Sequence, residues 1–399
     1  MSKRKKKVTG TGFGHPRQHR PKTLSNSKVI RLENVRLGGF ALTNSLPGEE
    51  VDVLSRAAIT SNDRDFYVYM EGISNLIISK AQEKGLFISL DSITDFVLVI
   101  HENETADLYL NDVPTAVEIL AKRDLQAGEA VSAMDIADIR RVKFENILFN
   151  TSDKVVACFK IGWKFGLFFD LTPNSQLDVE QMELDIGLLH KGLRFQYLYE
   201  ILSDPKTLER LISAGWFPFI EIISEINPLL KAFNYEFDIE GQEQALIKKF
   251  DKKRIEKISE RWWKKPIIYK HKEVLEAGLH AFSRGDYISC IKNISTEIEG
   301  VLVDLHLTEK GSIPGTKERL QYATSKGVQK SGGTASLLFP EEFLEYLNDV
   351  IFAQFNPLNP QGAGVSRHAV GHGRASGDSY TSSRALQYIL TLDQIVFYL

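Results

Sequence analysis

The stretch VVACFKIGWKFGLFFDL, residues 155–171, decides how the first half of this chain folds. Its two arms, residues 155–161 and 165–171, are rich in β-branched and aromatic side chains, and the three residues GWK separate them. Two such arms around a short segment that contains a glycine predict a β-hairpin. An antiparallel sheet is therefore expected in the N-terminal region.

A second hairpin is predicted upstream of the first. Residues 95–101 and 106–110 are mostly apolar, and the four polar residues between them indicate a turn. Two helices are expected beside these strands. One is an amphipathic helix over residues 66–84, and the other covers residues 113–122, with Pro114 in its first turn.

From residue 176 onward the pattern changes from strands to helices. Apolar side chains recur every three or four residues, which is typical of helices with one buried face. Helices are predicted over residues 178–203, 206–214, 217–233, 241–261, 271–283, 286–305, 340–355 and 381–399, with a short one between 311 and 333. Strands are accordingly expected only between about residues 30 and 175.

These patterns divide the chain into four parts. Residues 1–32 are predicted to be a basic, disordered tail, and residues 33–175 a small α/β domain with antiparallel hairpins. Residues 176–267 are expected to form a helical linker domain, and residues 268–399 an all-α bundle. The expected fold class is α+β.

Composition describes an ordinary globular protein. Of its 399 residues, 43% are hydrophobic and 25% are charged, and this length has room for two or three domains. No apolar run is long enough to cross a bilayer, so no membrane partner is expected. Cys158 and Cys290 lie far apart in apolar surroundings, which favours a reducing cytoplasm over a disulfide framework.

The basic tail stands out in a chain whose overall net charge is −3. Residues 1–32 carry only basic charges: Lys3, Arg4, Lys5, Lys6, Lys7, Arg17, Arg20, Lys22, Lys28 and Arg31. Such a segment can contact nucleic acid electrostatically. A solubilising tail or, in a eukaryote, an import signal is the alternative interpretation.

A second basic region surrounds Trp262 and Trp263. Lysines and arginines crowd the predicted helix 241–261 and the residues after it. Basic residues interleaved with aromatic rings could hold single-stranded RNA, with a base stacked on an indole. The alternative is a solvated helix face that ends in two packed tryptophans, which the acidic residues at helical spacing favour.

The sequence RHAVGH at residues 367–372 carries the strongest functional signal. It follows an amphipathic helix and a loop over residues 356–365, Ser366 is placed to cap a short helix, and a closing helix comes after it. An arginine and a histidine five positions apart in this setting resemble the Arg-x4-His motif of the HEPN helical domains. The resemblance covers roughly residues 268–399.

The resemblance implies a metal-independent endoribonuclease, of the kind found in bacterial antiviral and toxin-like proteins. Its residues suit that chemistry. His372 would act as base and acid because histidine titrates near neutral pH, and Arg367 would hold the phosphorane oxygens with its planar fork. His368 would be a polar helper. RNA is the implied partner, the products would carry 2′,3′-cyclic phosphates, and no cofactor or metal is expected.

Glu299 is the fourth candidate site residue. It lies at the margin of the apolar stripe of the predicted helix 286–305, as Glu297 does on the other margin. The segment around Glu299 resembles the second helix of HEPN proteins, where an acidic residue often faces the motif. Glu299 would then orient Arg367 or the histidine. A solvated helix edge is the alternative.

The spacing of the motif also bears on assembly. On a regular helix Arg367 and His372 would point about 140° apart, so they would not meet one phosphate from a single face. HEPN nucleases pair two motifs across a two-fold axis, and the resemblance therefore implies a homodimer through the C-terminal bundle.

Two other functions remain open at this point. A non-catalytic HEPN scaffold, or a nucleotide- or RNA-binding module, would need neither Arg367 nor His372. A zinc site on His368 and His372 is sterically possible because residues at i and i+4 share a helix face. However, Ala369 occupies the position where a zinc protease carries its glutamate.

Overall fold

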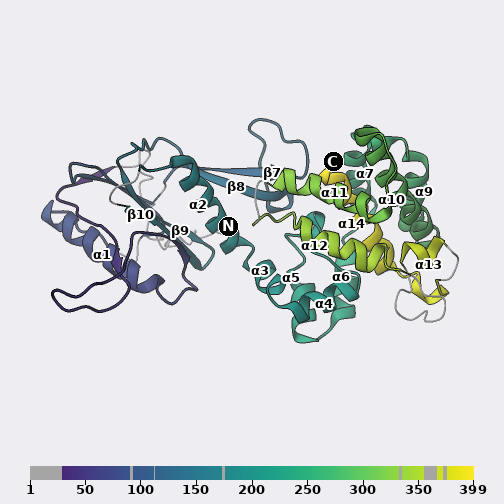
Figure 1. Cartoon of the computed structure of the whole chain (residues 1–399), viewed down its shortest axis with the longest axis horizontal. Coiled ribbons are helices and arrows are strands. Elements are labelled where there is room, and N and C mark those ends of the chain that lie inside the picture. Colours follow the sequence, from purple (N-terminus) through teal and green to yellow (C-terminus); the bar gives the residue numbers. More distant parts are fainter. Residues whose placement is uncertain are drawn as a thin grey trace, which may run out of the picture.

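The computed structural model describes residues 29–89, 93–111, 113–172, 176–331, 335–354, 366–371 and 375–399. The chain is a mixed α+β protein in which a sheet region lies at one end and a large group of helices at the other (Figure 1). The long hairpin β7–β8 runs between the two (Figure 1). Most of the predicted basic tail, residues 1–28, lies outside the described residues, as does the loop 356–365.

The main sheet is antiparallel and has six strands in the order β1-β6-β5-β9-β10-β4. Its strands are β1 (Ile30–Leu32), β4 (Arg56–Thr60), β5 (Phe96–Ile100), β6 (Ala106–Leu110), β9 (Lys154–Ile161) and β10 (Lys164–Asp170). Both predicted hairpins are thus confirmed, as β5–β6 and β9–β10. The edge strands β1 and β4 were not predicted. A separate small pair consists of β2 (Phe40–Ala41) and β3 (Val53–Leu54).

The two faces of this sheet bury different sets of side chains. Successive residues of a strand point to opposite faces, so Phe169 packs with the core on the side of helix α1 (Phe66–Glu83). Its neighbour Phe168 packs on the other side, with helix α2 (Val179–Arg194). Helix α1 was predicted over residues 66–84 and is confirmed.

The predicted helix over residues 113–122 is wrong. Residues Thr115–Ala121 form strand β7, which pairs with the unpredicted strand β8 (Ile136–Phe144). Thr115, Val117 and Ile119 alternate along this strand, and β-branched side chains fit a pleated surface better than a helix.

Helix α2 approaches strand β8 very closely. A Cβ added at Gly187 of α2 would lie 2.6 Å from the Cα of Arg141. Only a residue without a side chain fits there, because real Cβ atoms are not seen at this distance from backbone. Gly187 therefore fixes where α2 sits on the hairpin.

The middle helices differ from the prediction in where they break. The structure has α2, α3 (Gln196–Leu202), α4 (Pro205–Ser213), a 3-10 turn (Ile220–Ile222), α5 (Asn227–Tyr235), α6 (Ile239–Ile247), α7 (Lys252–Trp263) and α8 (Pro266–Tyr269). The predicted helix 178–203 divides at Phe195. The predicted helix 217–233 is reduced to the 3-10 turn and the start of α5. Pro218 disfavours helical backbone in the residue before it, whereas Pro228 lies in the first turn of α5, where proline is tolerated.

The C-terminal region is helical in all its longer elements. It contains α9 (Lys272–Ser283), α10 (Tyr287–Lys310), α11 (Thr316–Ser331), α12 (Pro340–Tyr346) with a π-helical turn (Leu347–Ile351), α13 (Arg367–Gly371) and α14 (Ser382–Tyr398). Within the described ranges, all strands lie between residues 30 and 170, as predicted. None of the helices in those ranges is long and apolar enough to span a membrane.

One hydrophobic core joins the middle and C-terminal helices. Phe217 and Trp262 of the middle region pack in the same cluster as Ile291 and Leu386 of the C-terminal region. Ile139 of strand β8 belongs to this cluster as well. Buried side chains from before and after residue 267 therefore share one core.

A buried ion pair holds the hairpin to its surroundings. Asp138 of β8 is fully buried and accepts a hydrogen bond from Lys191 Nζ of α2 at 3.0 Å. Its other carboxylate oxygen accepts one from Ser336 Oγ, just before α12, at 2.7 Å. Burial lowers the pKa of Lys191, although Asp138 offsets part of this effect. Three segments far apart in the sequence thus meet at one carboxylate.

We predict that Asp138→Ala will lower the free energy of unfolding by about 3–5 kcal/mol, because it leaves the Lys191 ammonium buried without its counter-charge. Urea denaturation followed by circular dichroism measures this. Lys143→Ala is the matched control on the same strand. Lys143 is 44% exposed in its pair with Glu118, so the loss there should stay below about 1 kcal/mol. Equal losses in the two variants would contradict the prediction.

Candidate functional site

The motif's arginine lies on a short helix that is anchored to the bundle. Helix α13 starts after Ser366, whose Oγ accepts a hydrogen bond from the Ala369 backbone N–H at 3.3 Å. Ala369 and Val370 are buried, and α13 packs against α10. Ser366 therefore occupies the capping position that the sequence predicted, and Arg367 is presented from the first turn with 27% of its side chain exposed.

Glu299 of α10 binds two arginines. One carboxylate oxygen forms an ion pair with Nη2 of Arg367. The other accepts a hydrogen bond from Nη2 of Arg319, on α11, at 3.0 Å. We call Glu299, Arg319 and Arg367 the Glu299 cluster. It joins three helices, and the candidate contact between Glu299 and the motif's arginine is present in the structure.

The Glu299 cluster carries more positive than negative charge. It contains two guanidinium groups and one carboxylate. Burial lowers the pKa of both Arg319 and Arg367, yet arginine starts so high that both stay charged at neutral pH. The Nε of Arg319 is buried and has no hydrogen-bond partner within the described part of the chain. The cluster is therefore suited to an anion.

Sequence reasoning missed Arg319. Its only signal is its place in α11, where Ala323 and Gly327 continue the same buried stripe at intervals of four residues. An arginine in such a stripe needs a partner, because a buried charge is costly without one. Tyr388 of α14 was also missed. It is fully buried close to Arg367, and burial raises the pKa of its hydroxyl.

Only one of the two histidines of the motif lies within the described residues. His368 is half-buried on α13, next to Arg367. His372 lies outside the described residues, so the base of the proposed reaction has no described position. Glu297, at the other margin of the α10 stripe, contacts a different residue: its Oε2 lies 2.5 Å from Nδ1 of His271.

Base stacking on Trp262 is ruled out. The Trp262 ring is completely buried, and its Nε1 donates a hydrogen bond to Asp393 at 2.8 Å. Arg261 bridges Asp393 and Glu221, so this basic residue is occupied by ion pairs. The packed interpretation of the tryptophans therefore holds for Trp262, whereas Trp263 is only partly buried.

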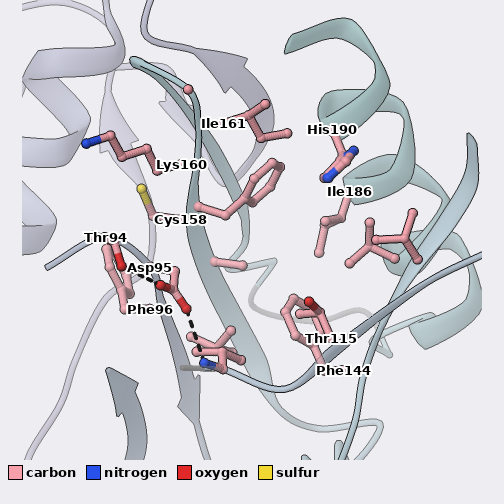
Figure 2. A pocket seen from close by; sticks show the side chains of 17 residues that line it. Thr94, Asp95, Phe96, Thr115, Phe144, Cys158, Lys160, Ile161, Ile186 and His190 are labelled. Carbon is pink, nitrogen blue, oxygen red and sulfur yellow. Dashed lines mark hydrogen bonds between the residues drawn. The ribbon is translucent and has the colours of Figure 1, made fainter. Parts of the chain in front are cut away.

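A cavity of about 360 Å³ lies between the main sheet, the β7–β8 hairpin and α2 (Figure 2). Most of its walls are apolar. They include Val97, Ala157 and Phe159 on the sheet and Phe144 on the hairpin. The β7–β8 hairpin forms the roof of this cavity. The cavity could not be predicted from the sequence, because the residues of β7 were predicted to be helical.

Among the described residues, no group of three or more histidine, cysteine or acidic side chains could hold a metal ion. Comparison with family models, with curated proteins and with solved structures finds no match to this chain.

We predict that Glu299→Ala will lower the free energy of unfolding by about 1–3 kcal/mol, since it leaves two partly buried guanidinium groups facing each other without a carboxylate. Denaturant unfolding measures the loss. Glu276→Ala, which removes an exposed carboxylate from α9, is the control and should change stability by no more than about 0.5 kcal/mol. Equal free energies of unfolding for Glu299→Ala and Glu276→Ala would contradict a stabilising role of the Glu299 cluster.

Proposed function

We propose that this protein is a metal-independent endoribonuclease whose site is the Arg-x4-His motif of a HEPN-like C-terminal bundle. The observation that supports it best is the ion pair between Arg367 and Glu299. It fixes the motif's arginine against the second long helix of the bundle, as the resemblance implies. The excess positive charge of the Glu299 cluster favours a phosphate as the ligand.

The proposed reaction is transesterification of RNA. His372 takes the proton of a ribose 2′-hydroxyl, whose oxygen then attacks the adjacent phosphorus. Arg367 stabilises the negative charge that builds up on the phosphorane oxygens. The bond to the 5′-oxygen breaks, His372 returns the proton to this oxygen, and the products carry a 2′,3′-cyclic phosphate and a 5′-hydroxyl. Glu299 acts as a positioning residue, and His368 as a polar helper.

The alternative is a HEPN bundle used as a scaffold or as a nucleotide- or RNA-binding module. One observation favours it. Arg367 is engaged by Glu299 and is only 27% exposed, as expected for an arginine that joins two helices. In the scaffold hypothesis the substitution of Arg367 would affect stability alone. In the nuclease hypothesis it would affect cleavage in a protein that remains folded.

The setting of the activity is part of the same proposal. The basic N-terminal segment would add electrostatic contact with nucleic acid. The protein would act in the cytoplasm, in antiviral defence or in a toxin-like role, as the resemblance implies.

We predict that His372→Ala will abolish RNA cleavage and that Arg367→Ala will slow it about 100-fold or more, since the first removes the base and the second the transition-state charge. Arg367→Lys should not restore activity, because an ammonium cannot fork two phosphate oxygens. His368→Ala should reduce the rate less. Gel-resolved cleavage of a mixed RNA pool, with analysis of the cyclic phosphate ends, measures these rates.

The control variant for this experiment is His280→Ala, which removes an exposed histidine from α9 and should leave the rate unchanged. EDTA should leave the wild type active, because no metal carries the charge. Activity that requires magnesium or zinc, or that survives His372→Ala, would overturn the mechanism. A folded wild type without cleavage of any RNA would favour the scaffold.

We also predict a homodimer formed through the C-terminal bundle, because one motif supplies half of a two-fold site. Light scattering at micromolar concentration, with RNA present and absent, should give twice the chain mass of 45.1 kDa. A strict monomer under both conditions would contradict the paired site while leaving the fold unaffected.

A further inference from the structure

The cavity beneath the hairpin exists because the main sheet presents a small side chain, Ala157, at the cavity floor. Ala157 of β9 pairs with Val97 of β5 on one side and with Phe168 of β10 on the other. Val142 and Phe144 of the hairpin line the same space, and Figure 2 shows Phe144 among the side chains around it. The resulting space is about 360 Å³, which falls within the range of about 300–1,000 Å³ that is usual for small-molecule sites.

Water is a poor occupant for this space. An ordered water needs two to four polar partners, and the walls here are mostly valine, isoleucine and phenylalanine side chains. Protein interiors are otherwise packed as densely as organic crystals. An apolar molecule would recover the dispersion contacts that the lining side chains lack.

The charged side chains at the cavity are already occupied. Asp95 accepts hydrogen bonds from the Val113 backbone N–H at 3.1 Å and from the Thr94 hydroxyl at 2.6 Å (Figure 2). The ammonium of Lys160 lies 5.5 Å from the ring centroids of both Trp163 and Phe165. Neither group is placed to neutralise a charged ligand inside the cavity.

The imidazole of His190, on α2, forms part of the cavity wall. Its Nδ1 is buried and has no hydrogen-bond partner within the described ranges. The ring stacks on Phe159 with 5.9 Å between centroids and 27° between planes. Burial lowers the pKa of His190 to about 4, so the imidazole is neutral and can exchange one hydrogen bond with an uncharged group.

We propose that this cavity is a binding site for a small, uncharged and largely apolar organic molecule, which packs on Phe159 and Phe144 and hydrogen-bonds to His190. The apolar walls select the body of the ligand, and the neutral imidazole of His190 selects one polar group on it. This site is independent of the proposed nuclease function.

The test uses two probes of the same shape. N-phenyl-1-naphthylamine is uncharged, apolar and carries one N–H donor, and its fluorescence rises in apolar surroundings. 1-Phenylnaphthalene lacks the donor and is measured by its displacement of the first probe. The full chain should bind both probes saturably. The absence of a saturable fluorescence rise would overturn the proposal.

Substitution at the mouth tests the location. Val117 lines the cavity from β7 and is 38% exposed, so Val117→Trp should fill the space and weaken both probes about tenfold or more. Val131→Trp is the matched control, since Val131 is 49% exposed and is not part of the lining. Undiminished binding to a folded Val117→Trp protein would place the probes elsewhere and overturn the site.

Substitution of the histidine tests the chemistry. His190→Phe keeps a ring against Phe159 and removes the nitrogen. Affinity for N-phenyl-1-naphthylamine should fall about 3- to 10-fold, the worth of one hydrogen bond, while 1-phenylnaphthalene stays within about 2-fold. Equal effects on both probes would overturn the role of His190 in ligand selection.

Discussion

The buried carboxylate of Asp138 is the interaction on which the arrangement of this protein depends. It lies on strand β8 of the separate β7–β8 hairpin, and Ile139 beside it belongs to the core of the helical region. Lys191 and Ser336 reach the same carboxylate from segments that belong to opposite ends of the molecule. A buried charge must be paired to be tolerated. The position of β8 is therefore fixed relative to α2 and to the chain before α12. The hairpin thus connects the sheet region to the helical region in one defined arrangement.

Glu299 plays the corresponding part within the C-terminal bundle. A single carboxylate on α10 positions Arg319 of α11 and Arg367 of α13. Helix α13 has only five residues, too few to be stable in isolation, so its place depends on the buried Ala369 and Val370 and on this ion pair. The motif is thus held by the rest of the bundle.

Local patterns predicted the fold where the side chains leave only one interpretation. Residues 155–171 alternate between two buried faces, and both strands form as expected. Residues 113–122 were misassigned because a short apolar segment fits either period, and its partner strand β8 was not recognised. Glu299 was a candidate because its segment resembles the second helix of HEPN proteins, since its place beside an apolar stripe is shared by Glu297. Arg319 could not be predicted, because its pairing with Glu299 depends on how α10 and α11 pack against each other. No local sequence pattern encodes that packing.

The ion pair with Glu299 also constrains how Arg367 could bind an anion. A guanidinium has five N–H donors, and Glu299 contacts Nη2 with one carboxylate oxygen. Nη2 belongs to both edges at which a guanidinium can fork an anion, one shared with Nη1 and one shared with Nε. A phosphate held in a bidentate manner would therefore approach along the edge that the carboxylate oxygen leaves open. That edge is set by the carboxylate, because rotation of the planar group would break the ion pair. The charge of Arg319 beside it keeps the cluster net positive, so Glu299 can orient Arg367 without cancelling its attraction for a phosphate. Orientation and charge are thus supplied by different residues of one cluster.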